Sequence, residues 1–394
     1  MSEHKSIQLG DVGKVSMCKR VLKSQTSSDG EIPFFKISTF GGEPSTYISK
    51  ELYGDFKERF SHPKIGDILI SAAGTLGKTV IYDGSPAYFQ DSNIVWIDND
   101  ESIVLNSYLY YFYQTKPWQT TNGSTINRIY NSDLKSINVS YPILNIQTKV
   151  AKVLSDIDKK IELNNKINAE LEEMAKLIYD YWFVQFDFPD ANGNPYKSSG
   201  GKMIYNEELK CEIPESWVVK GLSEIAKIKA GGDKPNKVSE KKTLECSIPI
   251  YSNGIKDFGI YGYTDTAKIN QPSVTISARG TIGVSFLRME PFVPIIRLIV
   301  VTPNNDVYLN YLNERLKASS FENSGSVQKQ LTAPQVSEQK IICPSNNLLE
   351  RYTSIASDCV RKIELCRNEN RELAELRDWL LPMLMNGQVT VKDA

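Results

Sequence analysis

The chain repeats itself, and this internal duplication limits its possible folds more than any single residue does. Three segments of the first half recur in the same order in the second half: residues 9–15 (LGDVGKV) as 222–228 (LSEIAKI), 71–77 (SAAGTLG) as 277–283 (SARGTIG), and 160–171 (KIELNNKINAEL) as 362–373 (KIELCRNENREL). The separation of about 200 residues is too long for a solenoid repeat and indicates two domains of one kind. The order along the chain is block, helix, block, helix.

Composition places the chain among ordinary globular proteins. It has 394 residues, of which 41% are hydrophobic and 24% charged, enough for two to four domains with cores of their own. No apolar stretch approaches the roughly 20 residues that span a bilayer, and residues 1–9 are too polar for a secretion signal. We therefore expect a cytoplasmic protein that does not contact a membrane.

The cysteines and the net charge exclude two further classes of site. The 6 cysteines form no CxxC pair and only 2 histidines are present, so we expect no metal site. Cys359 and Cys366 are expected to be small buried residues of a helix. The net charge of -1 lacks the basic excess of a chain that wraps DNA alone. If nucleic acid is the ligand, basic residues must be local or a partner must supply them.

Each block has the pattern of a mixed α and β domain. In the first block, residues 67–71 and 79–82 flank a glycine turn as in a hairpin, 92–97 are typical of a buried strand, and 106–114 of a helix. In the second block, the corresponding segments are 248–251, 273–277, 284–287, 295–301 and 309–316.

Two long amphipathic helices give the clearest structural signal. Seam positions recur at steps of three and four residues, as helices that pack along a line require. They are Val153, Ile157, Ile161, Asn164, Asn168 and Leu171 in the first helix, and Ile355, Cys359, Ile363, Cys366, Asn370 and Leu373 in the second. About 35 residues at about 1.5 Å each make a rod of roughly 50 Å, and such rods bury their apolar stripes most economically against each other.

The expected fold class is therefore α+β. Two similar mixed α/β domains are separated by two long antiparallel helices packed as a coiled coil, which gives the chain internal pseudo-two-fold symmetry. Asn168 and Asn370 are expected in the seam, where a polar residue costs stability and fixes register. The alternative is that both asparagines face water because the apolar stripe is broad.

Signatures of catalysis are absent or incomplete. Residues 74–79 (GTLGKT) resemble the end of a phosphate-binding loop, but the motif needs glycine where Ala72 stands. The second copy has Val284 and Ser285 in place of the lysine and threonine. No GxGxxG follows a strand and no GxSxG is present. We therefore assign no catalytic residue and interpret the glycines as turn formers.

One loose constellation is compatible with a metal-dependent nuclease. Asp190, Glu208 and Lys210 supply two carboxylates and a lysine, which could hold a divalent cation and activate water. The stretch 190–201 is rich in Asn, Gly, Pro and Ser and has the composition of a linker, which cannot fix metal geometry.

Over essentially its whole length the chain resembles the specificity (S) subunits of type I restriction and modification systems, the HsdS family. The resemblance is carried by "IQLGDVGKV" (7–15) and "IPESWVVKGLSEIAKIKAGG" (213–232), which open the two blocks, and by "DILISAAGTLGKTVI" (67–81) and "SVTISARGTIGVSF" (273–286) in their middles. The segments "YDYWFVQFDF" (179–188) and "LRDWLLPMLMNGQVTV" (376–391) are similar to the ends of the family's two conserved regions.

The resemblance implies a four-part organisation and a function without chemistry of its own. Residues 1–144 would form target-recognition domain 1, 145–187 the central helical spacer, 188–346 a linker and target-recognition domain 2, and 347–394 the C-terminal helical spacer. Each recognition domain would read one half of a bipartite target in double-stranded DNA. The helices would set the unread gap and hold two methyltransferase (M) subunits, with restriction (R) subunits in the full complex. This chain would bind no cofactor, whereas the partners would use S-adenosylmethionine, ATP and Mg²⁺.

Direct readout requires side chains that reach base edges. The candidates in the first domain are Lys36, Ser38, Thr39, Lys78, Ser124, Thr125, Asn127 and Arg128. Those in the second are Ser252, Asn253, Lys256, Arg279, Ser326, Gln328 and Lys329. Each could instead be a solvated loop residue or a phosphate anchor, because phosphate and sugar receive half or more of such hydrogen bonds. The aromatic residues of 108–113 could stack on bases, but core packing is favoured.

Three hypotheses follow for the function. The first is a DNA-recognition and assembly subunit, which the order and coverage of the motifs favour. The second is the metal nuclease, for which alanine at Asp190, Glu208 and Lys210 should abolish cleavage by the isolated chain. The third is a coiled-coil scaffold that binds no DNA, which would give a methyltransferase partner no target preference.

Overall fold

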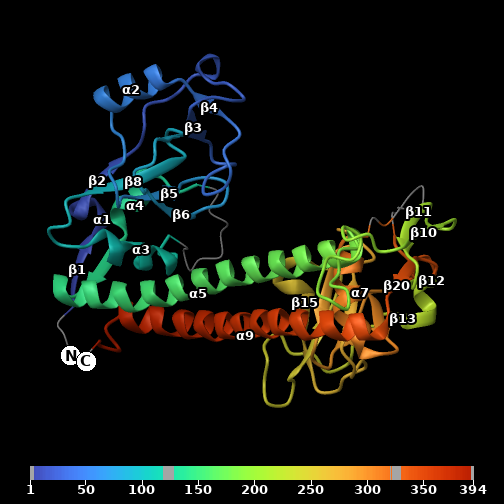
Figure 1. Cartoon of the computed structure of the whole chain (residues 1–394). Helices are drawn as coiled ribbons and strands as arrows, with labels where there is room; N and C mark the ends of the chain where they lie inside the picture. The colour runs from blue at the N-terminus through green and yellow to red at the C-terminus, as the bar shows by residue number, and fades with distance from the viewer. Residues whose placement is uncertain (1–3, 119–127, 320, 322–329, 392–394) are drawn as a thin grey trace. The chain divides into compact units, whose positions relative to one another are not determined.

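The structure, a computed structural model, describes residues 4–118, 128–319, 321 and 330–391, and its contacts divide the chain into two compact units. Unit 1 contains residues 1–164 and 368–394, and unit 2 contains residues 165–367. The two long helices are α5 (Leu144–Tyr179) and α9 (Asn346–Met385) (Figure 1). Each of them is divided between the units, with one segment in unit 1 and the other in unit 2.

Unit 1 places a block of strands and short helices before α5. In chain order the block contains β1 (Lys5–Gln8), α1 (Leu9–Val12), β2 (Gly13–Ser16), β3 (Ile32–Phe35), β4 (Tyr47–Ile48), α2 (Lys50–Arg59), β5 (Ile68–Ser71), β6 (Thr79–Ile81), β7 (Tyr88–Phe89), β8 (Ile94–Asn99), α3 (Asn106–Gln114), α4 (Asn131–Ser136) and β9 (Asn138–Tyr141). The strands form sheets in the orders β2-β8-β5-β6, β4-β3-β7 and β1-β9. All pairs are antiparallel except β3 with β7.

Unit 2 repeats this topology before α9. Its elements are β10 (Met203–Asn206), β11 (Cys211–Pro214), β12 (Val218–Gly221), α6 (Leu222–Ile225), β13 (Ala226–Ala230), β14 (Ile248–Tyr251), β15 (Ile260–Thr264), β16 (Ser273–Ile276), β17 (Ser285–Arg288), β18 (Val293–Pro294), β19 (Ile299–Pro303), α7 (Leu309–Lys317), α8 (Ala333–Ser337) and β20 (Lys340–Cys343). The sheet orders β13-β19-β16-β17, β15-β14-β18 and β12-β20 match those of unit 1, including one parallel pair, β14 with β18. The predicted fold class, two similar mixed domains with an internal repeat, is confirmed.

A pair of equivalent tyrosines shows that the repeat extends to side-chain contacts. Tyr108 in α3 donates a hydrogen bond from its hydroxyl to the Ser140 carbonyl oxygen at 3.0 Å. Tyr311 in α7 donates to the Ile342 carbonyl oxygen at 2.6 Å. Both rings are buried, and burial raises the pKa of Tyr108 to about 12. The same bond therefore fixes the short helix against the last strand in both units.

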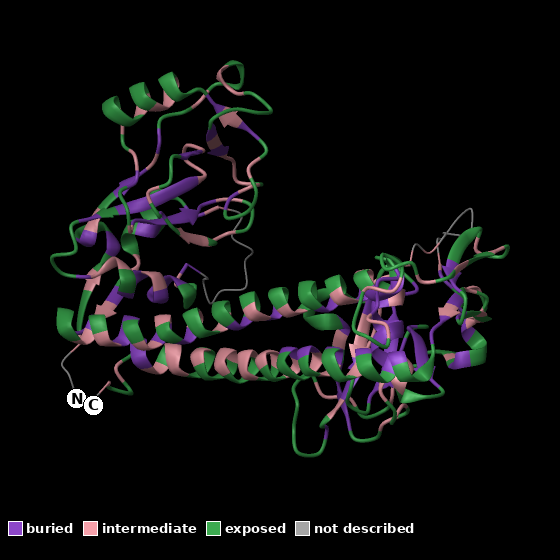
Figure 2. Ribbon diagram, viewed as in Figure 1, coloured by how far each residue is buried: buried purple, intermediate pink, exposed green. Residues whose placement is uncertain are grey.

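The central strands of unit 1 are buried on both faces. Ile68 and Ile70 in β5 belong to one hydrophobic cluster, whereas Leu69 between them belongs to a second. Because successive side chains of a strand point to opposite faces, β5 and its neighbour β8 separate two cores. Figure 2 shows these strands as buried. This double burial explains why they lack the alternation of a half-exposed strand.

Within unit 1 the two long helices run antiparallel. Asp158 of α5 pairs with Arg377 of α9, with an N–O distance of 2.9 Å. Six residues further along α5, Asn164 donates through Nδ2 to Glu369 Oε2 at 2.7 Å and to Asn370 Oδ1 at 2.9 Å. The partner's number falls as the number on α5 rises, so the prediction of an antiparallel pair is confirmed here.

The same direction holds within unit 2. Glu172 of α5 pairs with Arg367 of α9 at 2.8 Å. Trp182, in a π-helical turn (Asp180–Val184) that ends α5, lies 5.9 Å from the ring of Tyr352 in α9. Here too the residue number on α9 falls as the number on α5 rises, so the two helices run antiparallel within unit 2.

Eleven of the twelve predicted seam residues are buried or partly buried. Ile157, Asn164, Asn168, Cys359 and Ile363 are buried, and Val153, Ile161, Leu171, Cys366, Asn370 and Leu373 are partly buried. The assignment of Ile355 was wrong, because its side chain is 38% exposed while the next residue, Ala356, is buried. One residue along a helix is a rotation of about 100°, enough to move a side chain off the seam. The alternative that Asn168 and Asn370 both face water does not hold.

One strand assignment was also wrong in part. Residues 295–301 were expected to form a single strand, but β19 begins at Ile299. Ile296 and Arg297 have φ angles of 54° and 63°, a left-handed conformation that no strand adopts and that L-residues rarely take. A hydrophobic run carries no sign of such a turn, because both residues are compatible with a strand by composition.

Candidate functional site

The first copy of the glycine motif forms a turn built around one serine. Ser71 ends β5, and its backbone N–H donates to the Lys78 carbonyl oxygen at 2.9 Å. Its carbonyl oxygen accepts from the Gly77 N–H at 2.9 Å, and its Oγ accepts from the Lys78 N–H at 2.8 Å and donates to the Thr75 carbonyl oxygen. Four hydrogen bonds from one residue thus hold residues 71–78 in a single conformation.

The second copy uses the same four hydrogen bonds. The Ser277 N–H donates to the Val284 carbonyl oxygen at 2.9 Å, and its carbonyl oxygen accepts from the Gly283 N–H at 2.9 Å. Ser277 Oγ accepts from the Val284 N–H at 3.1 Å and donates to the Thr281 carbonyl oxygen. Because these bonds need only the serine and backbone groups, Lys78 can become Val284 without loss of the turn. The glycines act as turn formers in the described structure.

An aromatic ring covers the second glycine of each turn. Gly77 has φ of 72°, and a Cβ built on it would lie 2.1 Å from the ring of Trp118. Gly283 has φ of 88°, and its Cβ would lie 3.0 Å from the ring of Phe321. Both rings therefore need glycine at this position. The sequence analysis missed Trp118 and Phe321. A signal was present, because each aromatic residue stands four positions after the end of the equivalent helix, α3 or α7.

The chain returns to each turn along one edge. The Ile129 N–H donates to the Ala72 carbonyl oxygen at 2.9 Å, and the Leu331 N–H donates to the Ala278 carbonyl oxygen at 3.0 Å. Arg128 therefore lies beside the first turn. In the second unit, Arg279 on the turn donates through Nη2 to Gln330 Oε1 at 3.1 Å. The first turn and the segment that returns to it contain the predicted readout residues Lys78 and Arg128. In the second unit, Arg279 lies on the turn, and the predicted residues of the returning segment fall outside the described residues.

Several predicted readout residues of the first unit form hydrogen bonds with backbone groups. The Lys78 ammonium donates to the carbonyl oxygens of Phe40 and Gly41 at 2.6 and 3.1 Å. The Arg128 guanidinium donates to the Ser92 carbonyl oxygen at 2.9 Å. Thr39 accepts from the Lys36 N–H at 3.1 Å and donates to its carbonyl oxygen at 3.3 Å, which closes a local turn. Ser38 is exposed and Lys36 partly buried.

The predicted readout residues of the second unit likewise include one that binds backbone groups and others that are exposed. Asn253 donates to the Ile296 carbonyl oxygen at 2.7 Å and accepts from the Ala278 N–H at 2.7 Å, so its amide links two loops. Ser252 is partly buried, whereas Lys256 and Arg279 are exposed. The remaining candidates fall outside the described residues: Ser124, Thr125, Asn127, Ser326, Gln328 and Lys329.

Comparison with known proteins places both units in one family. A family model described as "Type I restriction modification DNA specificity domain" matches residues 1–173 and 214–375. The chain belongs to this family. The prediction of an S subunit is thereby confirmed, and most of each matched block lies in one unit of the structure: residues 1–164 in unit 1 and residues 214–367 in unit 2.

The relatives are specificity subunits of bacteria and an archaeon. The chain is 53% identical over 182 residues to a putative type I restriction enzyme specificity subunit of Haemophilus influenzae, an alignment that covers 45% of this chain and 46% of that protein. It is 25% identical to a type I restriction enzyme specificity subunit of Methanocaldococcus jannaschii, over 100% of this chain and 98% of the relative.

A solved structure shares the fold. The S subunit of a type I restriction-modification system from M. genitalium superposes with a TM-score of 0.61 at 18% sequence identity, covering 100% of this chain and 97% of that one. At this identity the likeness concerns the fold alone.

The aromatic residues of α3 belong to the core of this S subunit. Tyr108, Tyr111, Phe112 and Tyr113 are buried, and Tyr110 is partly buried. Burial raises the pKa of the Tyr113 hydroxyl well above its usual range. The interpretation as core packing is confirmed, and the alternative of stacking on exposed bases does not hold for the four buried rings.

The nuclease constellation has other roles in the S subunit. The Asp190 carboxylate accepts from the backbone N–H groups of Asn192 and Asn194 at 2.7 and 2.9 Å, closing a turn. Glu208 lies 3.1 Å from the Lys340 ammonium in an exposed ion pair. Among the described residues, no group of three or more His, Cys, Asp or Glu side chains could hold a metal ion. Nothing in these contacts supports the nuclease.

None of the helices searched within the described residues is long and apolar enough to cross a membrane.

Proposed function

We propose that this S subunit is the DNA-recognition and assembly subunit of a type I restriction-modification complex. Each unit would read one half of a bipartite target in double-stranded DNA. The observation that carries the proposal is that the DNA specificity domain is matched twice, with most of each match in a different unit. Supporting positions are the two glycine turns, beside which Arg128 and Arg279 lie. The site of action would be the cytoplasm, since the ligand is cellular DNA.

The long helices would have two tasks in the complex. They would hold two methyltransferase subunits, with restriction subunits in the larger assembly, and they would set the unread gap between the two half-sites. Base chemistry would lie in the partners, which would use S-adenosylmethionine for methyl transfer and ATP with Mg²⁺ for restriction. The net charge of -1 favours a chain that shares its phosphate contacts with partners.

Methylation mapping tests the proposed function. The chain would be produced with its methyltransferase partner, and the modified positions in the host DNA would be mapped. A single bipartite target with a fixed gap is expected. Modification without target preference would instead indicate a scaffold, and cleavage of DNA by the purified chain alone would indicate a nuclease.

A paired deletion tests whether the helices set the gap. Removal of residues 160–166 from α5 together with 368–374 from α9 takes away seven residues around the contacts of Asn164. Seven residues are two helical turns to within about 20°, so the apolar faces stay aligned. The rods shorten by about 10 Å, or about three base pairs at about 3.4 Å each. The mapped gap should shrink accordingly while both half-sites stay the same.

A control variant keeps the length of the helix. Leu163→Ala with Glu170→Ala changes two exposed side chains of α5, one inside the deleted stretch and one four residues beyond it. It should leave the gap unchanged. An unchanged gap in the paired deletion would refute the proposed role of the helices.

Substitution of Lys36 and of Lys78 distinguishes a proposed DNA contact from a contact that stabilises the fold. Lys36→Ala is expected to lower the salt slope of DNA binding by about one, as loss of one phosphate contact does, without a change in target. Lys78→Ala loses the bonds to Phe40 and Gly41, so it should lower the free energy of unfolding by about 1 kcal/mol. Fluorescence anisotropy of labelled DNA across a salt series, with urea unfolding of the same samples, measures both. An unaltered slope in Lys36→Ala would remove it from the contact surface.

A further inference from the structure

The two units differ at one equivalent place beside the long helices. Because Tyr108 and Tyr311 make the same hydrogen bond, α3 and α7 align residue by residue. Tyr110 and Tyr111 then correspond to Asn313 and Glu314. Two aromatic side chains of the first unit are replaced by smaller polar ones in the second.

In unit 1 this place is filled. The Tyr111 hydroxyl donates to Asp158 Oδ2 of α5 at 2.8 Å, and the Arg377 guanidinium of α9 donates to Asp158 Oδ1 at 2.9 Å. The rings of Tyr110 and Tyr111 lie 5.1 Å apart in an edge-to-face arrangement. Phenol, carboxylate and guanidinium thus form one connected cluster between the block and both helices.

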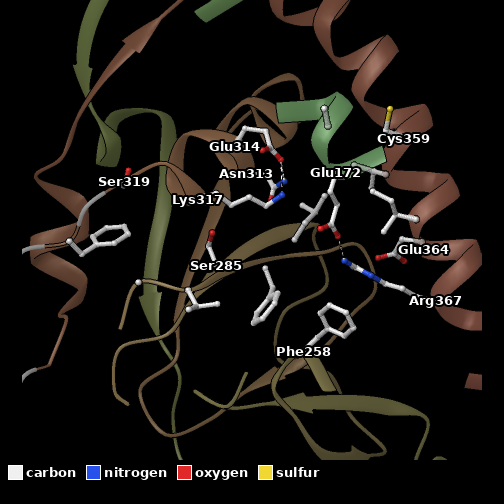
Figure 3. Close-up of a pocket in the computed structure, with 18 of the residues that line it drawn as sticks. Glu172, Phe258, Ser285, Asn313, Glu314, Lys317, Ser319, Cys359, Glu364 and Arg367 are labelled. Atoms are coloured by element: carbon white, nitrogen blue, oxygen red, sulfur yellow. Dashed lines mark hydrogen bonds and ion pairs between the residues drawn. The ribbon is translucent and has the colours of Figure 1, made fainter. Parts of the chain in front are cut away.

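In unit 2 the counterparts leave this place open. The match of residues 160–171 with 362–373 continues along both helices, so Asp158 corresponds to Val360 and Arg377 to Ala175. Val360, Ala175, Asn313 and Glu314 all line a cavity of about 600 Å³. Figure 3 labels Asn313 and Glu314 in its wall. Three of the four positions carry a smaller side chain than in unit 1. Smaller side chains at these three positions leave room where tyrosine and arginine side chains stand in the first unit.

Two polar atoms in the cavity wall lack a partner. Ser285 and Asn313 are 7% and 4% exposed, and among the described residues neither Ser285 Oγ nor Asn313 Oδ1 has a hydrogen-bond partner. Asn313 Nδ2 donates to Glu314 Oε1 at 2.7 Å, which leaves its oxygen as an acceptor for another molecule. A buried polar atom without a partner costs about 1–3 kcal/mol, so a ligand that supplies a donor would recover this energy.

The remaining wall is partly apolar and partly charged. Phe258, Ile282 and Phe286 line the cavity together with Glu172, Lys317, Glu364 and Arg367. The Arg367 guanidinium lies 4.2 Å from the ring centre of Phe258, and the buried Arg288 donates to the Phe258 carbonyl oxygen at 2.7 Å. Apolar surfaces with fixed polar groups, in a volume within about 300–1,000 Å³, are typical of small-molecule sites.

We propose that this cavity of unit 2 binds a small aromatic molecule that carries a hydrogen-bond donor, with a phenol as its chemical class. The aromatic group would take the place of the Tyr111 ring of unit 1, and its hydroxyl would donate to Asn313 Oδ1. The proposal does not rest on the proposed function, because it concerns a ligand other than DNA.

Binding of p-cresol and of toluene to the full chain tests the proposal. Saturation-transfer difference NMR is expected to detect p-cresol, and toluene should bind more weakly because it cannot donate a hydrogen bond. Asn313→Leu replaces the side chain with an apolar one of similar size and removes the acceptor Oδ1. The affinity for p-cresol should therefore fall about fivefold, whereas the affinity for toluene should not fall.

A filled variant serves as the second test. Ala175→Arg with Glu314→Tyr and Val360→Asp copies the cluster of unit 1 into unit 2, and it should abolish the binding of both probes. The proposal is overturned if p-cresol does not bind the natural chain. It is equally overturned if p-cresol binds Asn313→Leu as tightly as the natural chain, or if a filled variant that folds still binds it.

Discussion

Exchange of residues 5–141 for the corresponding segment of another S subunit is expected to change one half of the DNA target and to leave the other half and the gap intact. This segment contains every strand assigned to unit 1, from β1 to β9, so no sheet of that unit would be divided between two parents. The native α5 and α9 would remain, and with them the proposed spacing. Methylation mapping of DNA from cells that produce the hybrid with the methyltransferase partner measures the outcome.

The reciprocal exchange is the matched control. Residues 218–343 run from β12 to β20 in unit 2 and correspond to the exchanged segment of unit 1. Their replacement should change the other half of the target. If either hybrid alters both halves, or if both hybrids alter the same half, the two units are not independent readers.

Gly77→Ala is expected to be among the most destabilising single substitutions in the first glycine turn. Its φ of 72° costs an L-residue about 1–2 kcal/mol, and the new Cβ would lie 2.1 Å from the ring of the buried Trp118. Displacement of this ring, which lies 5.9 Å from that of Tyr113, adds to the cost. We expect a loss of about 3 kcal/mol or more in the free energy of unfolding, measured with urea.

Gly280→Ala supplies the control for backbone strain alone. Gly280 has φ of 69°, but among the described residues no heavy atom beyond its chain neighbours lies within 4 Å of a Cβ built on it. The expected loss is about 1 kcal/mol, from the left-handed conformation. Equal losses in the two variants would mean that Trp118 moves aside without cost.

Much of this fold was predictable because the repeat doubles each signal. The helix predicted at residues 106–114 has the bounds of α3, and the hairpin around residues 72–78 is formed by β5 and β6. In contrast, Leu9–Val12 and Leu222–Ile225 are helices of four residues between strands, too short to show a helical period. The strand predicted at residues 295–301 was wrong for a related reason, since two left-handed residues, Ile296 and Arg297, leave no periodic pattern in the sequence.

The candidate site was less predictable, because residue type does not reveal its partner. Lys78 was chosen as a cation beside a glycine turn, yet its ammonium binds carbonyl oxygens 37 and 38 residues earlier in the chain. Asn253 was chosen as a base reader, yet both ends of its amide hold other loops. Such contacts depend on tertiary structure. The replacement of Tyr111 by Glu314, in contrast, was visible in the repeat itself.

The interleaving of the two units sets an order for biosynthesis. Unit 2 is one continuous stretch, residues 165–367, whereas unit 1 also needs residues 368–394, where Leu384 and Met385 join the same hydrophobic cluster as Val150 and Leu154. On the ribosome, the part of the molecule that is translated first would therefore be the last to become complete. A released chain truncated shortly after residue 367 would carry a finished second unit and a first unit whose apolar helix face is still uncovered.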